Sequence, residues 1–166
     1  MDFSFEHSFA APPEAVAAVL LDLDFQRSLS DVGALEAREV LSQVEQEDGT
    51  VVRRTRSVLG IDLGAARPFV GDAEPAWEEE AIWDPDDLRW DWVIHPEVGA
   101  DLLAASGTIR IVGDGGAARR VITGRVKVKV PLYGGRVEGW IVDGLGRAYE
   151  EEADRLSAWL ARVTGP

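Results

Sequence analysis

The chain has 166 residues, with 30 acidic side chains against 17 basic ones and a formal net charge of −13. This length predicts one domain over residues 1–166, and the negative charge argues against a nucleic-acid partner and against attraction to anionic membranes. Six tryptophans are unusual in so small a chain, and the lack of cysteine excludes disulfides, thiolate metal sites and cysteine nucleophiles.

No segment of the sequence predicts export or a membrane span. Residues Met1 to Phe9 have neither the basic start nor the apolar core of a signal peptide. The longest apolar run, Ala15 to Leu21, is far shorter than the ~20 residues that span a bilayer. We therefore expect a cytoplasmic protein without membrane insertion, and the sequence leaves its oligomeric state open.

The chain begins with a strand and two short helices. Residues 3–9 alternate between apolar and polar side chains, which is typical of a half-buried strand, and His7 shares the apolar face. Prolines suit the first turn of a helix that begins near Pro12 and ends at Asp22. A second short helix is expected over residues 24–32, ending at Gly33.

Residues 35–45 and 50–59 form the first predicted hairpin. Asp48 and Gly49 join the two strands, and this pair is a strong hairpin signal because both residues tolerate a positive φ. The pattern leaves the inward face of this hairpin open, for both of its strands. One face carries Val40, Ser42 and Val44, and the other carries Leu41 among Glu39, Gln43 and Glu45.

Three arginines, Arg53, Arg54 and Arg56, form a basic cluster on the second of these strands. Cross-strand ion pairs with Glu39 and Glu45 are the favoured interpretation, and each pair would contribute little stability. The alternative is that the cluster supplies a counter-ion for the carboxylate of a ligand.

A long connection, residues 60–75, is punctuated by glycine and proline. Loops of this length inside compact domains are often lids or binding loops. We expect Phe69 to lie in such a lid.

The second predicted hairpin, residues 77–83 and 88–95, carries four of the six tryptophans. Trp90 and Trp92 share one face of the later strand, and Trp77 and Trp83 share a face of the earlier strand with Glu79. An inward Glu79 would be desolvated and would need a partner, which would make it a polar group in a pocket. The favoured interpretation is an exposed acidic edge.

A third hairpin and a long helix complete the expected α+β fold, in which helices gather on one side of an antiparallel sheet. The hairpin pairs residues 106–112 with residues 119–130, and the amphipathic helix covers residues 132–163. The apolar stripe of the helix consists of Val137, Ile141, Leu145, Tyr149, Ala153, Leu156, Leu160 and Val163. The residues expected largely to face water are Glu150, Glu151, Glu152, Asp154 and Arg155.

Gly139, Gly144 and Gly146 interrupt the first half of this helix. Each costs ~1 kcal/mol relative to alanine in a helix interior, so packing or space must compensate. Small residues either let a strand approach closely or leave room beside the helix. Large aromatic side chains opposite them are consistent with a pocket and equally with a packed core.

The sequence has no recognisable catalytic or metal-binding motif. Ser106 lacks the flanking pattern of a nucleophile elbow, and the glycines of residues 113–116 lie in a hairpin turn instead of a phosphate-binding loop. The two histidines, His7 and His95, are far apart in the chain. We therefore expect no metal site and no cofactor.

Three segments carry a resemblance to a known family. They are the opening Phe5 to Phe9, Ala10-Ala11-Pro12-Pro13-Glu14-Ala15-Val16 and Leu20-Leu21-Asp22, the motif Phe69-Val70-Gly71-Asp72, and the tail from Val126 to Glu138. The opening resembles the START-like, or SRPBCC, superfamily with its helix-grip fold. The other two segments resemble one bacterial subfamily, domain of unknown function 2505 (DUF2505).

The resemblance covers essentially the whole chain. It implies a curved sheet of seven antiparallel strands around the carboxyl-terminal helix, enclosing a deep hydrophobic cavity. Members of the superfamily bind lipids, sterols, polyketides or hormones, and some act as cyclases, aromatases or hydrolases. The matching motifs are structural, so the resemblance carries over no catalytic residue.

The leading hypothesis is a noncatalytic protein that binds a small hydrophobic or amphipathic molecule in this cavity. The residues expected to contact the ligand are Phe69, Trp77, Trp83, Trp90, Trp92, Trp140 and Ile141, with His7 and Glu79 as polar candidates. One alternative is a cyclase or aromatase in which His7, Glu79 or His95 acts as acid or base. Another is a protein-interaction module, which predicts an exposed apolar patch.

Overall fold

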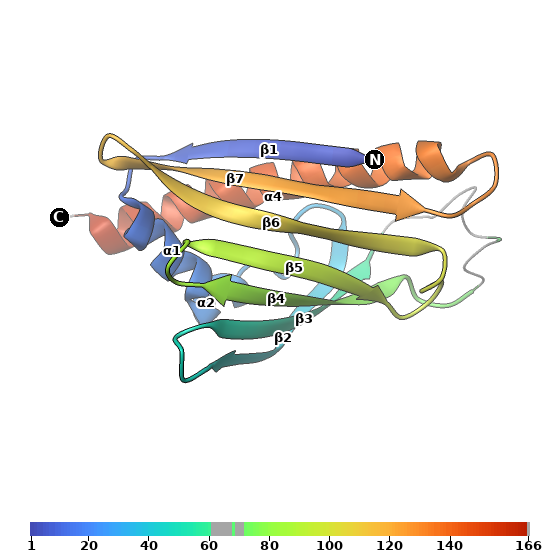
Figure 1. Ribbon diagram of the computed structural model, residues 1–166, viewed down its shortest axis with the longest axis horizontal. Coiled ribbons are helices and arrows are strands. Elements are labelled where there is room, and N and C mark those ends of the chain that lie inside the picture. The colour runs from blue at the N-terminus through green and yellow to red at the C-terminus, as the bar shows by residue number, and fades with distance from the viewer. Residues whose placement is uncertain (61–67, 69–71, 166) are drawn as a thin grey trace.

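A curved antiparallel sheet of seven strands is wrapped around one long helix in the computed structural model, which describes residues 1–60, 68 and 72–165 (Figure 1). The strands are β1 (Asp2–Phe9), β2 (Leu35–Glu45), β3 (Val51–Leu59), β4 (Ala76–Asp84), β5 (Arg89–Pro96), β6 (Leu103–Asp114) and β7 (Ala117–Val128). The helices are α1 (Pro13–Leu21), α2 (Leu23–Arg27) and α4 (Gly134–Thr164). The predicted order of elements and the α+β class are confirmed.

The sheet has the order β1-β7-β6-β5-β4-β3-β2. Strands that follow one another from β2 to β7 pair side by side, and β1 joins the free edge of β7. Two of the turns depend on glycine: Gly49 has a φ of +83°, and Gly115 and Gly116 have φ values of +59° and +95°. Residues other than glycine rarely adopt these φ values. Both turns lie where the sequence predicts them.

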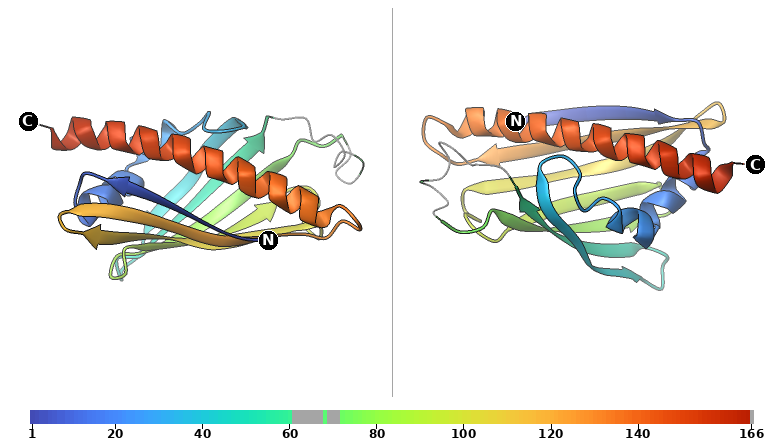
Figure 2. Two further views of the ribbon diagram at one scale, coloured as in Figure 1. Left: turned by 90° about the horizontal axis from the view of Figure 1, so that it is seen from above. Right: turned by 180° about the vertical axis from the view of Figure 1, so that it is seen from behind.

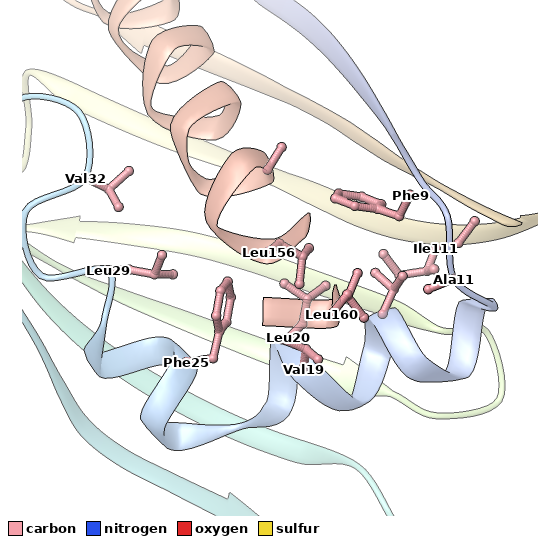
Figure 3. Packing of buried hydrophobic residues seen from close by; sticks show 13 residues of the cluster. Phe9, Ala11, Val19, Leu20, Phe25, Leu29, Val32, Ile111, Leu156 and Leu160 are labelled. Atoms are coloured by element: carbon pink, nitrogen blue, oxygen red, sulfur yellow. The ribbon is translucent and has the colours of Figure 1, made fainter. Parts of the chain in front are cut away.

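Helix α4 crosses the concave face of the sheet, and α1 and α2 lie at one end beside its carboxyl-terminal half (Figure 2). In the core at that end, Leu20 and Phe25 from the short helices pack with Leu156 and Leu160 from α4 (Figure 3). Trp159 of α4 packs edge-on against Phe25, with ring centroids 5.5 Å apart. Side chains therefore fill this end of the molecule.

Helix α2 is shorter than predicted. It ends at Arg27, and turns instead of helix lead to Gly33. Gly33 has a φ of +63°, and a Cβ added there would lie 2.8 Å from the Cβ of Ala148 on α4. The loop passes so close to α4 that only glycine fits, which explains why glycine stands at the predicted end of this segment.

A β-bulge in β2 decides which of its side chains point inward. The register between β2 and β3 shifts between Val40 and Ser42. The extra residue reverses the alternation, so Arg38 faces inward before the bulge and Gln43 faces inward after it. Neither of the two faces read from the sequence therefore points inward along the whole strand.

The three arginines of β3 divide between the two faces of the sheet. Arg53 is buried on the inner face. Arg54 and Arg56 point outward and form ion pairs with Glu78 and Glu97, respectively. These partners come from β4 and from the segment after β5, so the favoured prediction of pairing with β2 is wrong for both outward arginines.

Glu138 fixes the start of α4 over the sheet. Its Oε1 accepts the backbone N–H of Val128 at 2.9 Å, and its Oε2 lies 3.0 Å from the amino group of Met1. These contacts, chiefly the bond from Val128, lower the pKa of Glu138 to about 2. The buried carboxylate thus stays ionised and ties the helix to the end of β7.

The apolar stripe of α4 has two different surroundings. Leu156 and Leu160 are buried, whereas Val137 and Leu145 are only partly buried and line a cavity. Val163 is 60% exposed, so the stripe ends earlier than predicted. Within residues 1–60, 68 and 72–165, no helix combines the length and the apolar composition that crossing a membrane requires.

Candidate functional site

A cavity of about 760 Å³ separates the amino-terminal half of α4 from the sheet. Its walls come from strands β2 to β7, from α4 and from the short helices α1 and α2, and most of the lining side chains are apolar, among them Leu35, Ile94, Leu103, Val128 and Leu145. Concave, largely apolar spaces of roughly 300–1,000 Å³ are the usual form of small-molecule sites. The fold therefore provides a space suited to an organic ligand.

Four of the five tryptophans predicted to contact a ligand line the cavity, together with Ile141 of α4. They are Trp77, Trp90, Trp92 and Trp140. Trp83 does not line it, because its ring packs against that of Trp90 with centroids 5.4 Å apart. Trp140 is 51% exposed and so meets both the cavity and the solvent. Phe69, the residue expected in a lid, lies outside the described residues.

A glycine on the neighbouring strand makes room for one of these rings. Gly107 of β6 pairs with Trp92 of β5. A Cβ added at Gly107 would lie 2.7 Å from the Trp92 ring, closer than such contacts allow. The indole of Trp92 therefore lies across the backbone of β6, where it forms part of the cavity wall.

Two glycines of α4 play different roles in the same wall. At Gly144 an added Cβ would have no atom within 4 Å, and this residue lines the cavity. At Gly146 an added Cβ would lie 3.1 Å from the ring of Phe5. Of the two explanations considered from the sequence, spare room therefore applies to Gly144 and close approach of a strand applies to Gly146.

Two arginines bring positive charge to the cavity. Arg38 of β2 donates to the backbone carbonyl of Gln26 at 2.7 Å and to its side-chain oxygen at 2.8 Å. Arg53 of β3 donates from Nη1 to the carbonyl of Leu20 at 2.8 Å and to Oε1 of Gln43 at 3.3 Å. Because α1 and α2 supply these carbonyl groups, the short helices hold both guanidiniums in place.

Arg53 is the more deeply buried of the two arginines. Its side chain is 7% exposed, and its Cζ lies 4.2 Å from the ring centroid of Trp90, a favourable cation–π contact. Among the described residues its Nε has no hydrogen-bond partner. Burial, and next the charge of Arg38, lower the pKa of Arg53 to about 10, so the guanidinium stays charged at neutral pH.

Glu79 faces the cavity from β4. This placement differs from the exposed acidic edge that was the favoured interpretation of the sequence. Burial raises the pKa of the Glu79 carboxyl, and the charges of Arg38 and Arg53 oppose that shift. In the part of the chain that the structure describes, its carboxylate accepts no hydrogen bond.

Helix α4 adds Tyr149 and Glu152 to the wall. Behind them, the completely buried Arg120 of β7 donates to Oε1 of Glu152 at 2.6 Å and to the carbonyl of Tyr149 at 3.0 Å. The prediction that Glu152 faces water is therefore wrong, because Arg120 holds its carboxylate inward. Burial, followed by the charges of Glu79 and Glu152, raises the pKa of the Tyr149 phenol.

The two histidines lie away from the cavity. The Nδ1 of His7 is 3.3 Å from Arg120 and its Nε2 is 3.3 Å from Glu150, so its ring is held between β7 and α4 and is not among the lining residues. Burial and the charge of Arg120 lower the pKa of His7, which keeps the ring neutral. His95 is exposed on the outer face of β5. His7 is therefore a packing residue, and its prediction as a polar group in the cavity is wrong.

The polar wall residues that the sequence analysis missed include Arg38, Tyr149 and Glu152. Arg38 could not be assigned because the bulge in β2 hides its direction. The other two carried a usable signal, since Tyr149 belongs to the predicted stripe and Glu152 falls between its members at three- and four-residue spacing. A charged residue within an apolar stripe is a candidate inward group.

The chain matches one family model and is similar to several solved structures. A family model described as protein of unknown function (DUF2505) matches residues 4–160. No curated protein matches the chain. The solved structure of TTHA0849 from Thermus thermophilus is 23% identical, with a TM-score of 0.69 and coverage of 95% of this chain and 98% of that one.

Two further solved structures are similar along their whole length. The Zhui aromatase/cyclase from a Streptomyces species is 15% identical, with a TM-score of 0.70 and coverage of 99% of this chain and 95% of that one. A START superfamily protein from Mycobacterium smegmatis is 14% identical, with a TM-score of 0.62 and coverage of 98% of each chain. At these identities the likeness shows a shared fold.

Proposed function

The chain belongs to the DUF2505 family and has the helix-grip fold of START-like, or SRPBCC, proteins, and from this premise we propose that it binds a small hydrophobic or amphipathic molecule between α4 and the sheet. The observation that carries the proposal is the cavity of about 760 Å³, in which an apolar wall surrounds a few polar groups. Proteins rarely keep so large an apolar space without a use, because an unfilled cavity costs stability.

The lining indicates how such a ligand would be held. Burying its apolar surface against Trp77, Trp90 and Trp92 would stabilise the complex by roughly 25 cal/mol for each Å² removed from water. Arg38 and Arg53 would orient its polar end. Aromatase/cyclases are among the solved structures that share the fold, which supports a small organic molecule as the ligand.

Tryptophan fluorescence tests the proposal directly. The protein is titrated with a fatty acid, a sterol and an aromatic polyketide, one class at a time. Because four tryptophans line the cavity, we expect a saturable change in emission with at least one class. The absence of a response to every class would contradict the proposal.

A pair of variants locates the binding. Gly144→Leu places a side chain in the open part of the cavity, whereas Gly135→Leu adds the same side chain at an exposed position of α4 that does not line it. We expect Gly144→Leu to weaken binding by roughly tenfold or more, since about 1.4 kcal/mol of lost contact is enough. Gly135→Leu should bind as the wild type does. Equal weakening in both variants would place the ligand elsewhere.

Acid–base catalysis at Glu79 is the second candidate function. The observation that favours it is a cavity-facing carboxyl with a pKa raised by burial, which is the property of many catalytic acids and bases. Mass spectrometry of each bound compound after incubation separates the two functions. Conversion that disappears in Glu79→Gln supports catalysis, and recovery of every compound unchanged supports binding alone.

A further inference from the structure

The wall of the cavity carries more positive charge than its nearby carboxylates balance. In the part of the chain that the structure describes, neither Arg38 nor Arg53 forms an ion pair, and their hydrogen bonds go to carbonyl and amide oxygens. Buried charges in proteins are ordinarily paired, because removing them from water is costly. An unpaired buried guanidinium that lines a cavity therefore points to an anion that the cavity receives.

The hydrogen bonds of Arg53 leave part of its guanidinium without a partner. A guanidinium has five N–H donors, and the two on Nη1 account for the bonds to Leu20 and Gln43. The donors on Nε and Nη2 have no partner among the described residues. Nε is enclosed by its neighbours, so an anion in the cavity would reach Arg53 through Nη2.

The balance of charge supports the same conclusion. Glu152 is matched by Arg120 at 2.6 Å, which leaves Arg38 and Arg53 facing Glu79 alone. When Glu79 is ionised, one of these two positive charges is thus uncompensated. When Glu79 is protonated, both are. The remaining charged residues of the wall are Arg136, Asp143 and Arg147. A positive cavity inside a chain of net charge −13 is a local arrangement and not a result of composition.

We infer that the ligand is an amphipathic carboxylic acid, whose carboxylate binds Arg53 and Arg38 and whose apolar body lies against the tryptophans. This inference rests on the proposed binding function and names the chemistry of the ligand. A neutral hydroxyl group in the same place would leave the excess positive charge unbalanced. The charge-assisted bonds of a carboxylate are also roughly twice as strong as those of a neutral acceptor.

Glu79 couples this binding to pH. It faces Arg38 and Arg53 from the sheet side and Tyr149 and Glu152 from α4. A carboxylate bound beside Glu79 raises the pKa of Glu79 further, because two close negative charges disfavour each other. Binding then takes up a proton at Glu79, so the affinity for the acid increases as the pH falls.

The test compares ligands that differ only in the head group. Dissociation constants are measured for lauric acid and lauryl alcohol, and for 1-pyrenebutyric acid and 1-pyrenebutanol. We expect each acid to bind at least roughly tenfold more tightly than its alcohol, as hydrogen bonds to a charged group predict. A substitution that alters the cavity in general changes both constants, so the ratio of the alcohol's constant to the acid's still reports the preference for the carboxylate.

Matched arginine variants test whether the two cavity arginines cause the preference for the acid. Arg53→Met and Arg38→Met should bring the acid-to-alcohol ratio close to one while the alcohol still binds. Arg54→Met changes a neighbouring arginine on the outer face of β3 and should leave the ratio unchanged. If Arg53→Met fails to fold, Arg38→Met alone gives the answer, since its side chain is the less buried of the two.

The Glu79→Gln variant tests the coupling to pH. As the pH falls from about 8 toward the raised pKa of Glu79, affinity of the wild type for the acid should rise more steeply than that of Glu79→Gln, which cannot take up the proton. At the upper end of that range, Glu79→Gln should bind the acid at least as tightly as the wild type. Weaker binding of the acid by Glu79→Gln at every pH would contradict this part of the inference.

The outcomes separate the two proposals. Equal affinity for acid and alcohol overturns the inference about the head group and leaves the proposed binding function standing. A preference for the acid that Arg54→Met reduces as much as Arg53→Met overturns the assignment to the cavity arginines. Failure of all four compounds and of the fluorescence panel overturns the binding function itself.

Discussion

Arg120 illustrates how single residues link the sheet of this protein to its helix. The side chain has no exposed surface, and its two Nη atoms donate to Glu152 and to the carbonyl of Tyr149 on α4. Its Cζ also lies 5.8 Å from the ring centroid of Phe9 on β1. Because the charge is buried, its contribution depends on its partner: the pair is stable together, and either charge alone is costly.

Replacing Arg120 with methionine should therefore destabilise the fold strongly. The substitution leaves the carboxylate of Glu152 without its partner at 2.6 Å, and we expect a loss of about 3 kcal/mol in the free energy of unfolding, measured by urea denaturation. The double variant Arg120→Met with Glu152→Leu removes both charges and should recover much of that loss. A double variant that is less stable than Arg120→Met would contradict this account of the pair.

Helix α4 is one continuous element with two different tasks. Its carboxyl-terminal half packs Leu156 and Leu160 against the short helices and anchors the fold. Its amino-terminal half forms a cavity wall and contains Gly144, which has open space beside it. Within that half, Gly144 faces open space whereas Gly146 contacts Phe5, because residues two apart point to different sides of a helix.

Alanine substitutions at these two glycines should have different effects on stability. Gly144→Ala should raise the free energy of unfolding by about 0.5–1 kcal/mol, since alanine favours the helix and its methyl group meets no neighbour. Gly146→Ala gains the same propensity but must displace the ring of Phe5, so its net stabilisation should be smaller or absent. Chemical denaturation measures both, and an equal gain at the two positions would show that the Phe5 contact is not tight.

At the scale of the whole molecule, the sequence predicts the fold better than the interior. Alternation, glycine turns and the stripe of α4 identify the elements, because local periodicity determines them. The polar residues of the cavity depend instead on long-range features. The bulge between Val40 and Ser42 sets the direction of Arg38, and a buried arginine on β7 sets that of Glu152.

The prediction for Glu79 shows the same limit. Its position on the same face of β4 as Trp77 and Trp83 identifies the correct face, but a general rule that carboxylates are exposed favours the wrong interpretation. That rule describes packed cores, and it fails where the inner face of a sheet borders a cavity. The surplus of tryptophans was the more informative signal, because four of the six line that cavity.

The central claim, that the cavity binds a ligand, is tested most directly by the indole N–H signals of the six tryptophans in a two-dimensional NMR spectrum. Saturating 1-pyrenebutyric acid should shift the signals of Trp77, Trp90, Trp92 and Trp140, which line the cavity. The signal of Trp159, which packs against Phe25 in the core at the other end of α4, should stay in place. A spectrum without shifts, or shifts at Trp159 with the four others unchanged, would contradict binding in the cavity.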